Sequence, residues 1–331
     1  MLSLANLESW ATTESHFNGG GLMIEILKTK GVEQNIIQEY EEDAWVNVTN
    51  PSQEEIRMLS EKLKIPIDFL TSPLDIDESS RIEVEDGNML ILIRTPRFDS
   101  NNDIPFTTVP LGIILTQNMI ITLCSDKNDV AQAFISGRIR SWSSAKRSRF
   151  ILQIFSRTAL VYLNHLKQIN KQTSVVEDRL HKSMKNEEVI ELLNFEKSLV
   201  YFTTSLRANE LVMERLQKTD MLKMYPDDRD LLEDAIIENK QAIEMANIYS
   251  NILSGMMDAF ASVISNNLNM VMKFLTSVTI ILMLPTLIAS VYGMNIKLPL
   301  QKSPHAFAVT MGIAVLLTIL GVILFVRRKW F

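Results

Sequence analysis

Two long uncharged runs near the C-terminus constrain this chain more than any other feature. Residues 274–294 and 306–326 each contain 21 residues without a formal charge. At 1.5 Å of rise per residue, such a helix is about 31 Å long, which matches the hydrocarbon core of a bilayer. The link between them, residues 295–305, is too short to form a domain. The sequence therefore predicts a transmembrane hairpin that follows a long soluble region.

A heptad seam of small, polar and methionine side chains leads into the first run. Steps of four and three residues give Asp258, Ser262, Ser265, Asn269, Met272, Thr276, Thr279, Met283, Thr286, Ser290 and Gly293. After Lys273 the residues that flank this seam are mostly aliphatic. A polar seam on a helix whose other faces suit lipid is what a water-lined pore built from several copies requires. The alternative is close helix packing, since small residues mediate helix contacts and methionine fills gaps.

The first part of the chain reads as a mixed α/β domain. Short β-branched or aliphatic runs predict strands in residues 22–27, 44–49, 88–93, 109–115 and 119–123. Between them, residues 52–64 have helical spacing, and Ser52 with Glu55 forms a candidate capping box.

From about Val130 the pattern becomes helical, with helices predicted over residues 141–181 and 187–218. Pro226 suits a first helical turn, and no proline follows until Pro285, so one helix of about 58 residues and roughly 87 Å is predicted to enter the membrane. The sequence thus predicts five parts. They are an α/β domain (1–140), a helical segment (141–225), a stalk helix that continues into the first span (226–294), an outer loop (295–305), and a second span with a basic tail (306–331).

Composition narrows the cellular setting. The N-terminus lacks the basic and apolar regions of a secretory signal, and the single Cys124 provides no disulfide framework. We therefore expect residues 1–272 and both termini to be cytoplasmic, in a multi-pass protein of the cell (inner) membrane. The basic residues at 327–329 agree with the positive-inside bias, whereas Lys297 and Lys302 in the outer loop weaken it. A net charge of −6 argues against a nucleic-acid partner.

No catalytic constellation stands out. The four histidines are scattered without metal-ligand spacing, and the Gly19–Gly21 cluster lacks the Lys-Ser/Thr of a phosphate loop. We expect no enzyme activity and no organic cofactor.

The end of the first span carries a recognisable motif. Tyr292-Gly293-Met294-Asn295, placed between a long soluble helix and a second span, resembles the signature of the CorA-type magnesium channel family. The resemblance implies a funnel-shaped homopentamer, an α/β cytoplasmic domain with a helical stalk and two transmembrane helices per protomer. It also implies transport of hydrated Mg²⁺, with Co²⁺ and Ni²⁺ as further candidate ions. A zinc transporter of the same architecture and a membrane-anchored sensor or scaffold are the alternatives.

The same resemblance assigns roles to individual residues. The selectivity filter would be Gly293, Met294 and Asn295, although Gly and Asn also favour an ordinary helix C-cap. Pore-lining residues would be Asp258, Asn269, Met272, Met283 and Thr286.

The family closes when cytoplasmic Mg²⁺ binds acidic residues between protomers, and Asp234 occupies one such position. The other falls near Thr71-Ser72, where no acid stands, so Asp75 and Asp77 are the substitutes proposed, with a solvated acidic loop as the alternative. The outer loop also lacks the acidic residues that are common in the family.

Overall fold

The computed structural model describes residues 24–30, 33–37, 39–139, 142–183, 186–294 and 304–328. It consists of two compact units, Met1–Ser254 and Gly255–Phe331, whose boundary lies inside helix α6 (Pro226–Tyr292). The five-part division of the chain drawn from the sequence stays a prediction.

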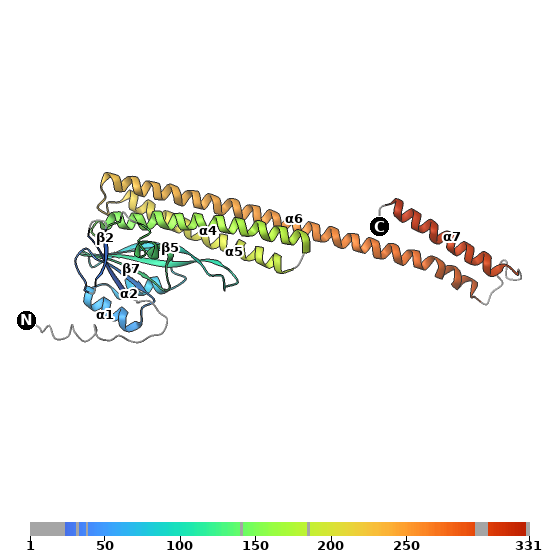
Figure 1. Cartoon of the computed structure of the whole chain (residues 1–331), viewed down its shortest axis with the longest axis horizontal. Coiled ribbons are helices and arrows are strands. Elements are labelled where there is room, and N and C mark those ends of the chain that lie inside the picture. The colour runs from blue at the N-terminus through green and yellow to red at the C-terminus, as the bar shows by residue number, and fades with distance from the viewer. Residues whose placement is uncertain are drawn as a thin grey trace, which may run out of the picture. The chain divides into compact units, whose positions relative to one another are not determined.

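The first unit is built around a seven-stranded sheet (Figure 1). Its strands are β1 (Ile24–Lys30), β2 (Glu33–Ile37), β3 (Trp45–Thr49), β4 (Arg81–Glu85), β5 (Asn88–Phe98), β6 (Phe106–Leu115) and β7 (Ile120–Cys124). The spatial order is β2-β1-β3-β7-β6-β5-β4, in which β3 and β7 are parallel and the other neighbours are antiparallel. All five strand regions expected from the sequence contain strands. β2 and β4 were missed because they lie at the two edges of the sheet, where polar residues are tolerated.

Helices cover both faces of this sheet. One face packs on α1 (Gln53–Leu63) and α2 (Ile67–Thr71), and the other on α3 (Asp129–Ile135), α4 (Arg147–Ser183), α5 (Asn186–Lys218) and the start of α6. Successive residues of a strand alternate between the two cores, so Ile120 belongs to one and Ile121 to the other. Burial on both faces explains why the five residues of β7 are all buried.

Local signals place two of these elements. The capping box at the start of α1 is confirmed: the Ser52 side chain accepts from the Glu55 backbone N–H, and Glu55 Oε2 accepts from the Ser52 N–H at 2.7 Å. The Trp45 ring is fully buried, donates from Nε1 to Thr122 Oγ1 at 2.8 Å, and meets Phe150 edge-on at 5.0 Å. This ring pins β3 against the helical layer.

The long helix predicted after Pro226 is confirmed: α6 continues through Pro285 to Tyr292, as expected for a stalk helix that runs on into the first apolar run. The second apolar helix, α7, spans Ala306–Arg327. Both α6 and α7 are long and apolar enough to cross a membrane.

A single glycine decides how closely the short 3₁₀ turn η2 (Ser72–Leu74) approaches the sheet. A Cβ on Gly112 would lie 2.2 Å from Pro73 Cγ, far inside van der Waals contact. We predict that Gly112→Ala destabilises the protein by about 1–3 kcal/mol through overpacking. Gly255→Ala is the matched control, because nothing lies within 4 Å of its added methyl and alanine favours a helix. A thermal melt of the full-length protein in detergent checks the pair; equal melting temperatures would contradict the prediction.

Candidate functional site

The heptad seam of α6 faces outward in the single chain. Every seam residue from Asp258 to Gly293 is exposed, including the large apolar side chains of Met272 (54%) and Met283 (64%). The residues predicted to line a pore, Asp258, Asn269, Met272, Met283 and Thr286, therefore lie on one open face of the helix.

Helix α7 packs against a different stripe of α6. Ser277 is fully buried, and Ile281, Leu284 and Ile288 are half-buried on the same side of the helix. On α7 this contact uses small residues: Ala314 is 4% exposed, and a Cβ on Gly321 would lie 3.2 Å from Leu284 Cδ1. At 3.6 residues per turn this stripe lies roughly opposite the seam. Close packing between α6 and α7 therefore does not account for the seam.

Seam hydroxyls already donate their protons to the helix. Thr279 Oγ1 donates to the Leu275 carbonyl at 2.8 Å, and Thr286 Oγ1 donates to the Leu282 carbonyl at 3.0 Å. A hydroxyl that has donated its one proton keeps only acceptor capacity. The exposed oxygens of Thr279 and Thr286 thus present lone pairs, the groups that accept hydrogen bonds from water bound to a cation.

The helix ends where the motif begins. The Gly293 N–H donates to the Ala289 carbonyl at 2.9 Å, and the Met294 N–H donates to Val291 at 3.3 Å. Gly293 and Met294 are both exposed, and the φ of Gly293 is not left-handed, unlike the usual glycine C-cap. The predicted filter residue Asn295 lies outside the described residues.

The three candidate regulatory acids are exposed in the first unit but are not brought together. Asp234 lies on α6, whereas Asp75 and Asp77 lie in a turn in which Asp75 Oδ1 accepts from the Asp77 N–H at 3.0 Å. Within the described ranges, no group of three or more His, Cys, Asp or Glu could hold a metal ion. A site shared by neighbouring protomers would have to be completed by a second chain.

Two arginines hold the acidic turn in place. Arg94 Nη1 donates to the carbonyls of Ile76 at 2.9 Å and Glu78 at 2.7 Å. Arg81 donates to Ser72 Oγ at 3.2 Å and pairs with Glu78. Sequence reasoning missed both residues. The only signal for Arg94 was a charged residue at the end of an apolar strand run.

Glu238 is a further acidic residue that the sequence reading overlooked. It lies one helical turn after Asp234 and accepts a hydrogen bond from Ser156 Oγ at 2.9 Å. Burial raises the pKa of Glu238 above its ordinary value, the Ser156 bond opposes this, and the charge of Asp234 adds to the rise. The pair concentrates negative potential on this part of α6.

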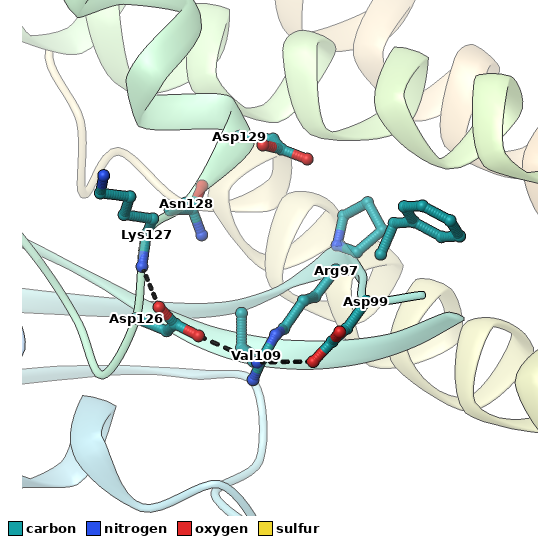
Figure 2. A pocket seen from close by; sticks show the side chains of 9 residues that line it. Arg97, Asp99, Val109, Asp126, Lys127, Asn128 and Asp129 are labelled. Carbon is teal, nitrogen blue, oxygen red and sulfur yellow. Dashed lines mark hydrogen bonds and ion pairs between the residues drawn. The ribbon is translucent and has the colours of Figure 1, made fainter. Parts of the chain in front are cut away.

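A second acidic area is a cavity of about 230 Å³ at the end of β5 and the start of α3. Figure 2 shows the side chains that line it. Two of its three carboxylates are already engaged, because Arg97 bridges Asp126 at 3.0 Å and Asp99 at 3.4 Å, while Asp129 lies apart from them. Arg97 therefore already neutralises part of the negative charge of this cavity.

The fold and the exposed polar seam define a class of membrane protein: an α/β unit whose long helix α6 continues into an apolar segment, followed by a second apolar helix, α7. Residues 41–328 match the family model described as CorA-like Mg²⁺ transporter protein. The chain belongs to this family of Mg²⁺ and divalent-cation transporters.

Comparison with individual relatives supports the same family. The chain is 30% identical over 296 residues to the cobalt/magnesium transport protein CorA of Methanocaldococcus jannaschii, covering 86% of this chain and 90% of the relative. It is 24% identical over 305 residues to the magnesium transport protein CorA of Helicobacter pylori, covering 88% and 92%. The solved structure of the complete Methanocaldococcus jannaschii CorA magnesium transporter superposes with a TM-score of 0.82 at 28% identity, covering 95% of this chain and 100% of that one.

The contact between α6 and α7 generates a prediction. Gly321→Leu should push α7 away from Leu284 and lower the melting temperature of the detergent-solubilised protein by several degrees, in line with about 1–3 kcal/mol of overpacking. Gly312→Leu is the control on the same helix, because nothing lies within 4 Å of a Cβ there. If the two variants melt alike, Gly321 does not set the helix spacing.

Proposed function

We propose that the chain forms a homopentameric channel that conducts hydrated Mg²⁺ down its electrochemical gradient, with Co²⁺ and Ni²⁺ as further permeant ions. The carrying observation is the polar seam of α6, which is exposed on the face opposite α7 and ends at the Gly293-Met294-Asn295 motif. Membership of the CorA-like family supports the choice of ion.

In this proposal several copies of the seam surround one aqueous path. Mg²⁺ releases its water reluctantly and requires near-octahedral coordination, so transport of the hydrated ion avoids a large dehydration barrier. Asn295 amide oxygens would accept hydrogen bonds from the bound waters at the mouth, and the Thr279 and Thr286 oxygens would do so deeper in the path. The exposed Met272 and Met283 side chains would form apolar constrictions that resist wetting when the helices close.

No chemical fuel is required for entry. A double charge that crosses a membrane potential of 100 mV gains about 4.6 kcal/mol, twice the figure for a single charge. With both termini on the cytoplasmic side, a negative interior drives Mg²⁺ inward, toward the exposed Asp258 on the same seam.

The decisive experiment measures Mg²⁺ uptake by liposomes that contain the purified protein and a fluorescent Mg²⁺ indicator. Uptake that cobalt hexammine inhibits, and that Asn295→Ala alters, supports a filter for the hydrated ion. Zn²⁺ flux without Mg²⁺ flux would replace the proposal by a zinc transporter. No divalent flux, with a monomer in detergent, would favour an anchored sensor.

One hydroxyl on the seam offers a matched comparison. We predict that Thr286→Val lowers the rate of Mg²⁺ uptake about threefold to tenfold, the equivalent of one hydrogen bond of roughly 0.5–1.5 kcal/mol. Thr318→Val is the control, because its hydroxyl donates to the Ala314 carbonyl on α7, away from the seam. An unchanged rate for Thr286→Val would remove Thr286 from the conduction path.

We also propose that Mg²⁺ on the cytoplasmic side closes the channel by binding Asp234 together with Asp75 and Asp77 of a neighbouring protomer. Asp234→Asn should raise the Mg²⁺ concentration that halves the flux by about tenfold, since one charge of the ligand set is lost. Asp230→Asn, an exposed carboxylate one turn earlier on α6, is the control. Equal inhibition of wild type and Asp234→Asn, measured as current at increasing internal Mg²⁺, would contradict the role of Asp234.

A further inference from the structure

A cavity of about 680 Å³ lies between the starts of α4 and α6 in the first unit, and none of the acidic-turn residues lines it. Four of its ten lining residues are cationic: Lys146, Arg147, Arg149 and Lys223. Two carboxylates, Asp227 and Asp228, also line it, which leaves a formal balance of four positive against two negative charges. In a chain whose net charge is −6, this is a local reversal of sign.

Part of this charge has a structural use. Arg149 pairs with Asp228 at 3.1 Å, and Asp228 also accepts from the Tyr225 N–H at 3.1 Å, where it caps the start of α6. Arg147 Nη1 donates to the carbonyls of Thr116, at 2.9 Å, and Gln117. These contacts hold the cavity walls in place and neutralise one of the two carboxylates.

Two ammonium groups have no such use. Lys146 and Lys223 are exposed, lie in the segments that precede α4 and α6, and form no ion pair within the part of the chain that the structure describes. Asp227 is the one carboxylate of the lining without a cationic partner in that same part. Two free cations against one free anion favour an anionic ligand.

The backbone adds to this potential. Helix α4 runs for 37 residues from Arg147 and has no acidic residue in its first turn. Its first residues line the cavity, so its positive end lies at the cavity without a carboxylate of its own to offset it. Phosphate groups are the anions that such an arrangement of cations and helix dipole accommodates well.

An aromatic ring at the same cavity narrows the ligand class. Tyr225 lines the cavity and is 65% exposed, so its ring is available for stacking. Exposed aromatic rings beside basic groups bind nucleobases by stacking while the cations hold phosphates. A volume of about 680 Å³ also exceeds what inorganic phosphate needs.

We propose that this cavity binds a nucleoside polyphosphate, with Lys146 and Lys223 on the phosphates and Tyr225 on the base. The proposal concerns ligand binding alone and does not depend on ion conduction.

The test uses the full-length protein in detergent, titrated calorimetrically with ATP and separately with inorganic tripolyphosphate in the presence of a chelator. Wild type should bind ATP more tightly than tripolyphosphate. Lys146→Ala combined with Lys223→Ala should weaken both at least tenfold. Lys167→Ala combined with Lys171→Ala, exposed lysines elsewhere on α4, removes the same charge and should change neither. Tyr225→Ala should reduce ATP affinity to that of tripolyphosphate.

Three outcomes would overturn the proposal. Absence of ATP binding to wild type removes the site, and equal losses in the two double-lysine variants would reduce it to a general charge effect. Equal affinities of wild type for ATP and tripolyphosphate would remove the nucleoside from the ligand. Unchanged melting temperatures of the variants would show that any loss of binding does not come from misfolding.

Discussion

A helix that enters a bilayer must satisfy its backbone polar groups internally, and much of the architecture of this protein follows from that requirement. α6 meets it without interruption from the soluble unit to the start of the motif, apart from the donor missing at Pro285. Because the backbone hydrogen bonds are made within the helix, the side chains of α6 can form two different surfaces. One stripe binds α7 through small residues, and another remains open and polar.

In the first unit, α6 has a different role: its beginning is part of the hydrophobic core. The sheet of this unit is covered on both faces, and the first turns of α6 close one of those faces through Leu232, Ala235 and Ile236. The beginning of the helix is therefore held by a hydrophobic core on one side, and the same turns carry the exposed Asp234 and the half-buried Glu238 on another. The acidic residues and the open seam therefore belong to one continuous helix, α6.

Prediction from sequence worked best where the determining forces are local or periodic. The capping box of α1 involves two residues three apart, and α6 follows from helical spacing that no proline interrupts between Pro226 and Pro285. The edge strands β2 and β4 failed because their pairing partners, not their own composition, place them in the sheet. The seam was recognisable, but the stripe around Ser277 was not, since only the position of α7 distinguishes two small-residue faces on one helix. Arg94 and Arg81 were missed for the same reason, as their partners are carbonyls and side chains that only folding brings near.

The heptad spacing of the seam has a geometric consequence for any assembly that uses it. A seam that repeats every 3.5 residues on a helix of 3.6 residues per turn drifts by about 20° per heptad. Five heptads separate Asp258 from Gly293, so on a straight helix the two would point about 100° apart. Copies of α6 that keep the whole seam on one axis must wind around each other with a left-handed twist. Loosening or tightening that twist would turn the two ends of the seam toward or away from the axis by different angles, so the Asp258 end and the motif end need not open together.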